Sequence, residues 1–206
     1  MTSIDPSPDI HAAARGDRGA FDRLVVLYHA RVYQFLRRRC PTAADAEDAT
    51  QEAFLRAWMA INRFDPAGSA SFTTWLFTLA ARAAATHGRS RDADRRARER
   101  LQREAGFQST DVHLQSPSAD LWKLADQELK PEPRAMLWLR YAEDLTPAQI
   151  ARVMQRSEVG VRVTLLRARR RLARAALQSS FIDSIAEDQT LALALDSGPA
   201  SEAPHA

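Results

Sequence analysis

The segment 146–177, TPAQIARVMQRSEVGVRVTLLRARRRLARAAL, constrains the fold most, because it encodes two helices separated by a tight turn. Thr146, Pro147 and Gln149 supply an N-cap hydroxyl, a proline at the first helical position and a capping-box glutamine. Ser157 can cap the second helix, whose apolar side chains recur at helical spacing while its arginines fall mostly elsewhere. The pattern predicts a helix-turn-helix whose second helix enters a DNA major groove. The alternative is a helical hairpin with a solvated cationic face.

Arginine is concentrated in two blocks of the chain. All but two of the 29 Lys and Arg residues are arginine, and eight lie in 82–103 and eight in 147–177. No Lys or Arg follows residue 177, where acidic side chains gather instead. The two blocks predict a polyanionic partner. The acidic tail is expected to be disordered, and a weaker hypothesis has it fold back on the basic helix and restrain DNA binding.

Composition and motifs exclude several classes of protein. Cys40 is the only cysteine, so an internal disulfide is excluded and a cysteine zinc site is not expected. The first twenty residues lack a signal-peptide core, and no apolar run is long enough to span a bilayer, so we expect a cytoplasmic protein. There is no glycine-rich phosphate loop, HExxH motif or nucleophile elbow, and the five histidines lack ligand spacing. We therefore expect no enzyme activity, no cofactor and no metal.

Helical signals dominate the rest of the chain and predict an all-α fold. An apolar stripe runs through 21–36, Thr42 with Asp45 begins a second helix, and Ser71 can cap a third. The pattern fails after Gly88, where an arginine-rich helical extension is expected to run into a flexible linker. The predicted organisation is a disordered leader at 1–8, a helical domain at 9–100, a linker at 101–117, a second helical domain with the helix-turn-helix at 118–177, and the tail at 178–206.

The predicted second helix carries four carboxylates within eight residues, namely Asp45, Glu47, Asp48 and Glu52. On a helix, positions 45, 48 and 52 share one face, which predicts an exposed acidic ridge beside an apolar seam. Three interpretations remain open: a solvated ridge, a surface that docks another protein, or a metal site.

Aromatic side chains surround the predicted turn at 65–70. Phe64 and Phe72 flank it, and small hydroxyl residues lie in and after it. Aromatic faces beside hydroxyls and cations are typical of single-stranded nucleic acid binding, in which bases stack and phosphates meet positive charge. The alternative is that these rings belong to the core. We expect Trp75 and Leu76 to be largely core and the turn itself to be the contact surface.

Three runs resemble bacterial RNA polymerase sigma factors. DAEDATQEAFLRAWMAINRF and SFTTWLFTLAARAAATHGRSR are similar to the second conserved region of that family, and LKPEPRAMLWLRYAEDLTPAQIARVMQRSEVGVRVTLLRARRRL is similar to the fourth. A chain with only these two helical domains and a short linker resembles the extracytoplasmic-function (ECF, group IV) class. The resemblance covers about 10–100 and 118–177.

The resemblance implies a role for each part of the chain. The acidic ridge would dock on core polymerase. The aromatic loop would melt the −10 element and capture a flipped base, and the helix from Ser157 would contact duplex −35 DNA. An anti-sigma factor is expected for many relatives. Polymerase-binding residues would be Asp45, Asp48, Gln51, Glu52 and Arg56. Residues for the −10 element would be Phe64, Ser69, Ser71, Phe72, Thr73, Arg82 and His87. Residues for the −35 element would be Ser157, Glu158, Arg162, Val163, Thr164, Arg167 and Arg169.

The chain departs from the family pattern at three places. Arg82 stands where the family usually has an asparagine in the third helix, and the turn at 154–157 lacks the usual glycine. Thr164 replaces an arginine, which leaves Val163 on the expected DNA face. The leading hypothesis is a sigma factor that directs promoter recognition, −10 melting and initiation. The alternatives are a stand-alone helix-turn-helix regulator and a degenerate sigma-like interaction protein.

Overall fold

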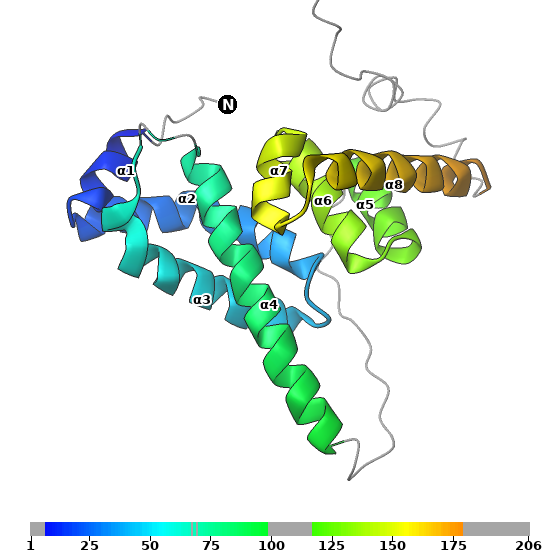
Figure 1. Ribbon diagram of the computed structural model, residues 1–206, viewed down its shortest axis with the longest axis horizontal. Helices are drawn as coiled ribbons and strands as arrows, with labels where there is room; N and C mark the ends of the chain where they lie inside the picture. The colour runs from blue at the N-terminus through cyan, green and yellow to red at the C-terminus, as the bar shows by residue number, and fades with distance from the viewer. Residues whose placement is uncertain (1–6, 67, 69, 99–116, 179–206) are drawn as a thin grey trace, which may run out of the picture.

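The computed structural model describes residues 7–66, 68, 70–98 and 117–178, without the side chains of 87–98, 117–120 and 178. Within these ranges every regular element is helical, as the sequence predicts. The helices form two groups, seen in Figure 1 as α1 to α4 on one side and α5 to α8 on the other. None of the described helices is long and apolar enough to cross a bilayer.

The first group contains α1 (Ser7–Ala14), α2 (Arg18–Arg37), α3 (Ala43–Ala60), a short 3-10 helix (Ile61–Arg63) and α4 (Phe72–Arg98). The predicted cap residues begin two of them: the Thr42 hydroxyl accepts the Asp45 N–H at 3.1 Å, and the Ser71 hydroxyl accepts the Thr74 N–H at 3.2 Å. Phe35 of α2 and Phe77 of α4 meet edge to face at 5.3 Å in the core. Fully buried alanines on α3 let that helix pack against α2 and α4.

The second group contains α5 (Pro117–Glu128), α6 (Pro131–Tyr141), α7 (Pro147–Met154) and α8 (Glu158–Gln178). The predicted capping box at the start of α7 is present, since Thr146 and Gln149 bond each other's backbone N–H groups. On α8 the predicted core stripe is confirmed for Val161, Leu165, Ala168 and Leu172, all of which are buried. This stripe faces α5, α6 and α7, which all pack against α8.

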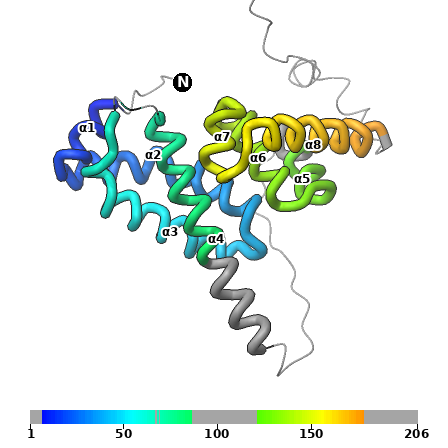
Figure 2. Tube along the Cα trace, viewed as in Figure 1, coloured from blue at the N-terminus to red at the C-terminus, as the bar shows by residue number. Residues whose placement is uncertain are grey.

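The two groups pack against each other, with α2 against α6 and α4 against α7. The trace in Figure 2 shows α7 lying between α4 and α8. The Arg31 guanidinium binds the Glu143 carboxylate at 2.5 Å, and the Glu143 side chain is only 1% exposed. The Arg38 guanidinium lies over the rings of Trp122 and Trp138, at 4.6 and 4.0 Å from their centroids.

Several helix boundaries differ from the predicted ones by a few residues. Helix α1 begins at Ser7, two residues before the predicted start of the first helical domain at residue 9. Helix α4 continues to Arg98, which agrees with the expected basic extension, and α5 already begins at Pro117. Residues 1–6 of the predicted leader, 99–100 of the first predicted domain, 101–116 of the predicted linker and 179–206 of the tail lie outside the described residues. The hypothesis that the tail folds back therefore also lies outside them.

Candidate nucleic-acid and protein interfaces

Helix α3 presents an acidic face to solvent, because its opposite face is filled by core alanines. Glu47, Asp48 and Gln51 are exposed, and Glu52 is half-buried. The Arg56 Nε donates to a Glu52 carboxylate oxygen at 2.6 Å, one helical turn further on, and both side chains are 33% exposed. We call the surface formed by Glu47, Asp48, Gln51, Glu52 and Arg56 the acidic ridge.

Asp45 does not share this exposed face, so the prediction that it does was wrong. Its exposed fraction is 3%, and its Oδ2 accepts the Thr42 hydroxyl at 2.7 Å. The physical reason is the cap: a residue three positions after an N-cap threonine turns its side chain back toward the start of the helix. Asp45 therefore fixes where α3 begins. Among the described residues, no cluster of three or more metal-ligand side chains is found.

The rings around the turn after the 3-10 helix form one cluster. Phe64 lies 5.6 Å from Phe72 and 5.1 Å from Trp75, and Phe72 lies 5.5 Å from Trp75, centroid to centroid. Phe72 is buried at 6% exposure, while Phe64 and Trp75 are half-buried. Leu76 is fully buried as expected, but Trp75 is less buried than expected. Phe72 therefore packs against the other two rings from the core side, and Phe64 and Trp75 expose part of their ring surface to solvent.

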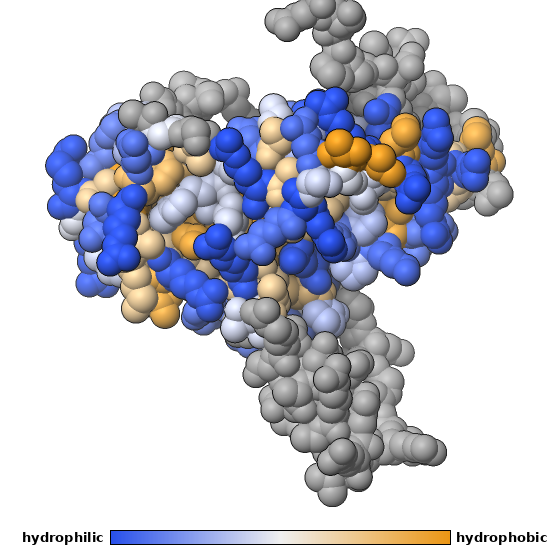
Figure 3. Space-filling view, in the orientation of Figure 1, coloured by the Kyte–Doolittle hydropathy of each residue, from blue (hydrophilic) through white to orange (hydrophobic). Residues whose placement is uncertain are grey.

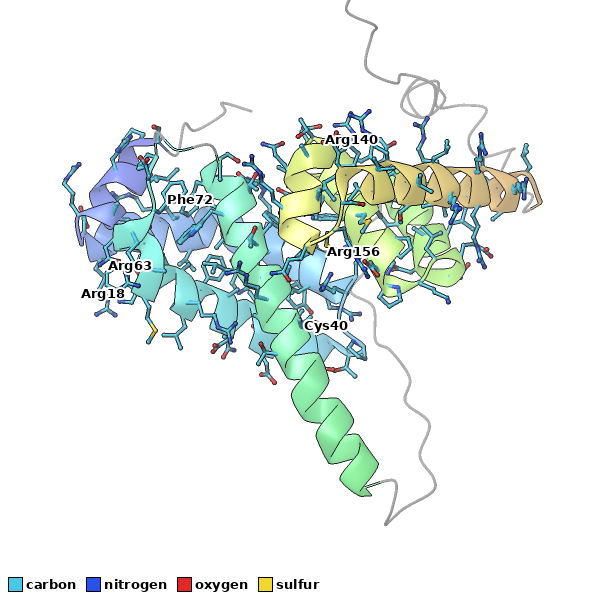
Figure 4. The ribbon with its side chains drawn as sticks, in the orientation of Figure 1. Arg18, Cys40, Arg63, Phe72, Arg140 and Arg156 are labelled. Atoms are coloured by element: carbon cyan, nitrogen blue, oxygen red, sulfur yellow. The ribbon has the colours of Figure 1, made fainter. Side chains whose placement is uncertain are left out.

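Polar residues of this region line the start of α4, at which Figure 4 labels Phe72. Ser71 is exposed and caps the helix, and the half-buried Thr73 hydroxyl lies 3.4 Å from the Tyr28 hydroxyl. Arg82 is exposed three turns along the same helix. Ser69 and the side chain of His87 lie outside the described residues. The hydroxyls and half-buried rings thus lie at the start of α4, and an exposed guanidinium follows about three turns further along the helix.

The turn between α7 and α8 closes without a glycine. Gln155 adopts the left-handed conformation, with φ 53° and ψ 48°. The Arg156 N–H then donates to the Ala151 carbonyl at 3.0 Å and the Gln155 N–H to the Arg152 carbonyl at 3.4 Å, the pattern of a Schellman motif. The Arg156 side chain, labelled in Figure 4, faces solvent and binds Glu132 at 2.7 and 3.0 Å.

Helix α8 begins at the predicted cap, where the exposed Ser157 hydroxyl accepts the Gly160 N–H at 3.1 Å. The exposed Arg162 donates to Glu158 at 2.6 and 3.1 Å. The half-buried Thr164 donates its hydroxyl to the Gly160 carbonyl at 2.7 Å. Further along the helix, Arg167 is exposed and Arg169 is half-buried. The cationic face of α8 is thus open to a ligand.

Sequence reasoning identified Val163 on this face but missed Val159 and Leu166. All three are exposed, although the core stripe of the same helix is fully covered. The signal was present in the spacing, since 159, 163 and 166 recur at i, i+4 and i+7 without coinciding with the buried positions 161, 165, 168 and 172.

An exposed cationic second helix that follows a short capped helix defines a DNA-binding helix-turn-helix protein. Comparison with known families gives the class more closely. Residues 24–94 match the model of sigma-70 region 2, and residues 125–172 match the model of sigma-70 region 4.

Two curated relatives align over most of the chain. It is 32% identical over 174 residues to the ECF RNA polymerase sigma factor BldN of Streptomyces coelicolor, covering 80% of this chain and 63% of BldN. It is 31% identical over 179 residues to the RNA polymerase sigma-H factor of Pseudomonas aeruginosa, covering 81% of this chain and 91% of that protein. The chain thus spans less than two thirds of the Streptomyces relative but most of the Pseudomonas one.

Two solved structures share the fold. One is the sigma factor RpoE of Bartonella quintana in complex with the anti-sigma factor NepR, with a TM-score of 0.62, 19% identity, and coverage of 78% of this chain and 98% of that one. The other is CnrH in complex with the cytosolic domain of CnrY, with a TM-score of 0.58, 24% identity, and coverage of 85% and 100%.

The chain belongs to the extracytoplasmic-function class of the sigma-70 family of RNA polymerase sigma factors. Sigma factors of this class direct RNA polymerase to promoters and start transcription there; they are not enzymes themselves. Of the three functions that the sequence leaves open, the sigma factor is therefore the one that the comparisons support.

Proposed function

We propose that this chain docks on core RNA polymerase through the acidic ridge of α3, opens the −10 element with the turn and helix at 64–87, and binds duplex −35 DNA with α8. The observation that carries this proposal is the occurrence, in one chain, of an acidic docking helix and a helix-turn-helix with a cationic second helix. The polymerase supplies all chemistry, so the chain contributes docking, recognition and strand opening. Such a protein works in the cytoplasm, where the polymerase and the chromosome are.

The acidic ridge suits a basic protein surface. Glu47, Asp48 and Glu52 extend along one side of α3 with a single cation, Arg56, among them. Opposed charges across an interface steer the encounter of the partners and suppress wrong ones. Asp45 contributes indirectly, because it fixes the start of the helix that carries the ridge.

The −10 residues would act in two ways. Half-buried Phe64 and Trp75 offer ring faces on which an extruded base can stack, and Phe72 holds these rings in place from the core. Ser71, Thr73 and Arg82, together with Ser69 and His87, are proposed to contact the sugar-phosphate backbone and the flipped base. The Arg82 guanidinium has only hydrogen-bond donors, so it would bind phosphates or acceptor atoms of a base. An asparagine at this position could both donate a hydrogen bond to a base and accept one from it.

The −35 residues are proposed to divide between orientation and recognition. Ser157 and Thr164 shape the beginning of α8, while Arg162, Arg167 and Arg169 are placed to meet phosphates. Glu158 and Val163 would face base edges. An anti-sigma factor, the kind of partner that RpoE has in its complex, is a further proposed ligand of this chain.

Charge reversal on the ridge tests the docking. We expect the double variant Asp48→Lys, Glu52→Lys to lose at least tenfold in affinity for core polymerase, because like charges would then face each other across the interface. Co-migration of the purified chain with core polymerase measures this affinity. Glu128→Lys is the matched control, since Glu128 is 35% exposed and paired with an arginine, as Glu52 is. Equal binding by the ridge variant and the control contradicts docking through α3.

Co-migration with core polymerase and initiation from promoters together separate the alternatives. A stand-alone regulator binds DNA but does not co-migrate with core polymerase. A degenerate sigma-like protein co-migrates but supports no initiation from any promoter. Only the proposed function requires both activities.

A further inference from the structure

Helix α8 carries an uncovered apolar stripe among its arginines. Val159 is 70% exposed, Val163 39% and Leu166 45%, and their spacing of i, i+4 and i+7 places them in one line. Figure 3 shows an orange patch over the beginning of α8 on this face, between blue side chains. We call these three residues the aliphatic stripe.

The charge around the stripe indicates which partner covers it. Arg162 and Arg167 are exposed on either side of the stripe, and the exposed Arg170 follows Leu166 in the same line. A cationic surface of this kind complements the phosphates of duplex DNA. The stripe also lies at the N-terminal half of the second helix of a helix-turn-helix, the part that approaches base edges in the major groove.

The polar groups near the stripe are already engaged with one another. Glu158 and Arg162 are joined by hydrogen bonds of 2.6 and 3.1 Å, and the Thr164 hydroxyl donates to the Gly160 carbonyl. Hydrogen-bonding readout of a base by these side chains competes with these existing bonds for the Arg162 Nε and Nη2 donors, one Glu158 oxygen and the Thr164 hydroxyl hydrogen. Valine and leucine have no such bond to break and no polar atom to leave unsatisfied.

We propose that the aliphatic stripe recognises the C5 methyl groups of thymines, so that the −35 element is selected for thymine rather than by a bidentate arginine contact to guanine. The thymine methyl is the one apolar feature that the four bases present in the major groove. The stripe extends about 10 Å along the helix, which corresponds to about three base pairs of duplex DNA. This inference rests on the proposed −35 role of α8 and adds the chemistry of its specificity.

Replacing thymine by deoxyuridine tests the inference, because only the C5 methyl group is lost. Duplexes bound by holoenzyme are first selected from templates with a randomised −35 region, and each thymine in the bound window is then replaced singly by deoxyuridine. We expect the wild-type chain to bind the thymine duplex about fourfold more tightly for each contacted methyl group. In Val163→Ala the ratio of the affinities for the thymine and deoxyuridine duplexes should fall to about one at one position of the window. In Val159→Ala and Leu166→Ala this affinity ratio should fall to about one at neighbouring positions.

Leu177→Ala is the control, since Leu177 is also an aliphatic residue of α8, 70% exposed, but lies at the far end of the helix. It should leave the ratio unchanged. All these side chains are exposed, so the variants should remain folded. A selected window without thymine, or a wild-type ratio of one, overturns the inference. The inference is also overturned if the stripe variants lose affinity for core polymerase but keep the thymine-to-deoxyuridine ratio. The aliphatic stripe would then be a protein-docking surface.

The proposed function fails separately from this inference. The proposed function fails if the wild-type chain does not co-migrate with core polymerase. The thymine-to-deoxyuridine affinity ratio does not depend on that result, because it is also measured with the full chain alone on the same duplexes. A chain that co-migrates and initiates, but shows no methyl preference, contradicts only the role of the aliphatic stripe.

Discussion

Gln155 holds a backbone conformation that favours glycine. Its φ of 53° lets the chain leave α7 and form the two Schellman hydrogen bonds that lead into α8. An L-residue pays about 1–2 kcal/mol in this region because its Cβ approaches the following carbonyl oxygen. Where the family usually has glycine, this chain therefore carries local strain directly before the helix proposed to contact DNA.

Glycine at this position should relieve the strain. We expect Gln155→Gly to raise the free energy of unfolding by about 1 kcal/mol, measured by denaturant titration. Ala173→Gly, at an exposed position with helical backbone in α8, should lower it by about 1 kcal/mol, because glycine is the poorer helix former there. A loss of stability in both variants contradicts the account of Gln155.

Residues with local roles were largely predictable from the sequence. Thr42, Ser71, Thr146 and Ser157 all cap the helices expected of them, because a cap depends on side chains within three residues. Asp45 shows the limit of such reasoning. Helical periodicity alone placed Asp45 on the acidic ridge. In the structure its carboxylate accepts the Thr42 hydroxyl, so the side chain points back toward the start of α3.

Helix α8 combines three faces in one element. One side is the core stripe, one is cationic, and one carries the aliphatic stripe. The core stripe follows from helical spacing and was predictable. The exposure of Val159 and Leu166 was not, because an aliphatic residue in a sequence is expected to be buried until the packing of α5, α6 and α7 shows which side they cover.

Electrostatic contact by α8 predicts a salt-dependent phenotype. Arg162→Ala should weaken binding of the full chain to −35 duplex DNA and reduce the slope of log affinity against log salt by about one unit, because one fewer counterion is released. Arg23→Ala is the matched control, since Arg23 is an exposed arginine paired with an acid, Asp9, in the first helical group. A slope equal to that of the wild type removes Arg162 from the phosphate contacts.

In the whole molecule two groups of helices pack together that, in the proposed function, act at separate promoter elements. Elements at −10 and −35 are about 25 base pairs, or roughly 85 Å, from each other on the promoter, whereas α4 and α7 are in contact here. The proposed function therefore requires the contact between the two groups to open before both elements are bound at once. Arg38 lies where the end of α2 meets α5 and α6, with its guanidinium over the Trp122 and Trp138 rings. It is only 8% exposed, and burial lowers the pKa of its guanidinium to about 10.

Glu143 makes this contact sensitive to pH. Burial raises the pKa of its carboxyl, and the hydrogen bond from Arg31 opposes that rise only in part. The packed state therefore holds a proton more tightly than an open state in which Glu143 is solvated. Packing is strongest below the carboxyl's ordinary pKa of 4.5 and weakens as the pH rises through the raised pKa.

In the Glu143→Gln variant the packing of the two groups of helices should no longer depend on pH through residue 143, because the amide does not titrate. We expect the radius of gyration of the wild-type chain, measured by small-angle scattering, to grow as the pH rises through the titration of Glu143. The variant should stay packed over the same interval. Glu128→Gln, a half-buried acid of α5, should follow the wild type. Identical profiles for wild type and Glu143→Gln contradict the role of Glu143.

Contacts between the two groups could not be predicted from the sequence. Arg31 and Glu143 are 112 positions apart, and neither lies in a run with a distinctive spacing. The contact of the Arg38 guanidinium with the Trp122 and Trp138 rings likewise depends on how the two groups of helices meet. Sequence reasoning described two domains joined by a linker, which is correct for the fold class, but only the structure shows the surface that joins them.

Runoff transcription with purified core polymerase tests the central claim most directly. Templates come from a library of genomic upstream fragments, and transcripts are sequenced with and without the added chain. We predict defined start sites that appear only with the chain, share −10 and −35 sequences, and disappear with the Asp48→Lys, Glu52→Lys variant. A chain that co-migrates with core polymerase but starts no transcript from any fragment contradicts the account.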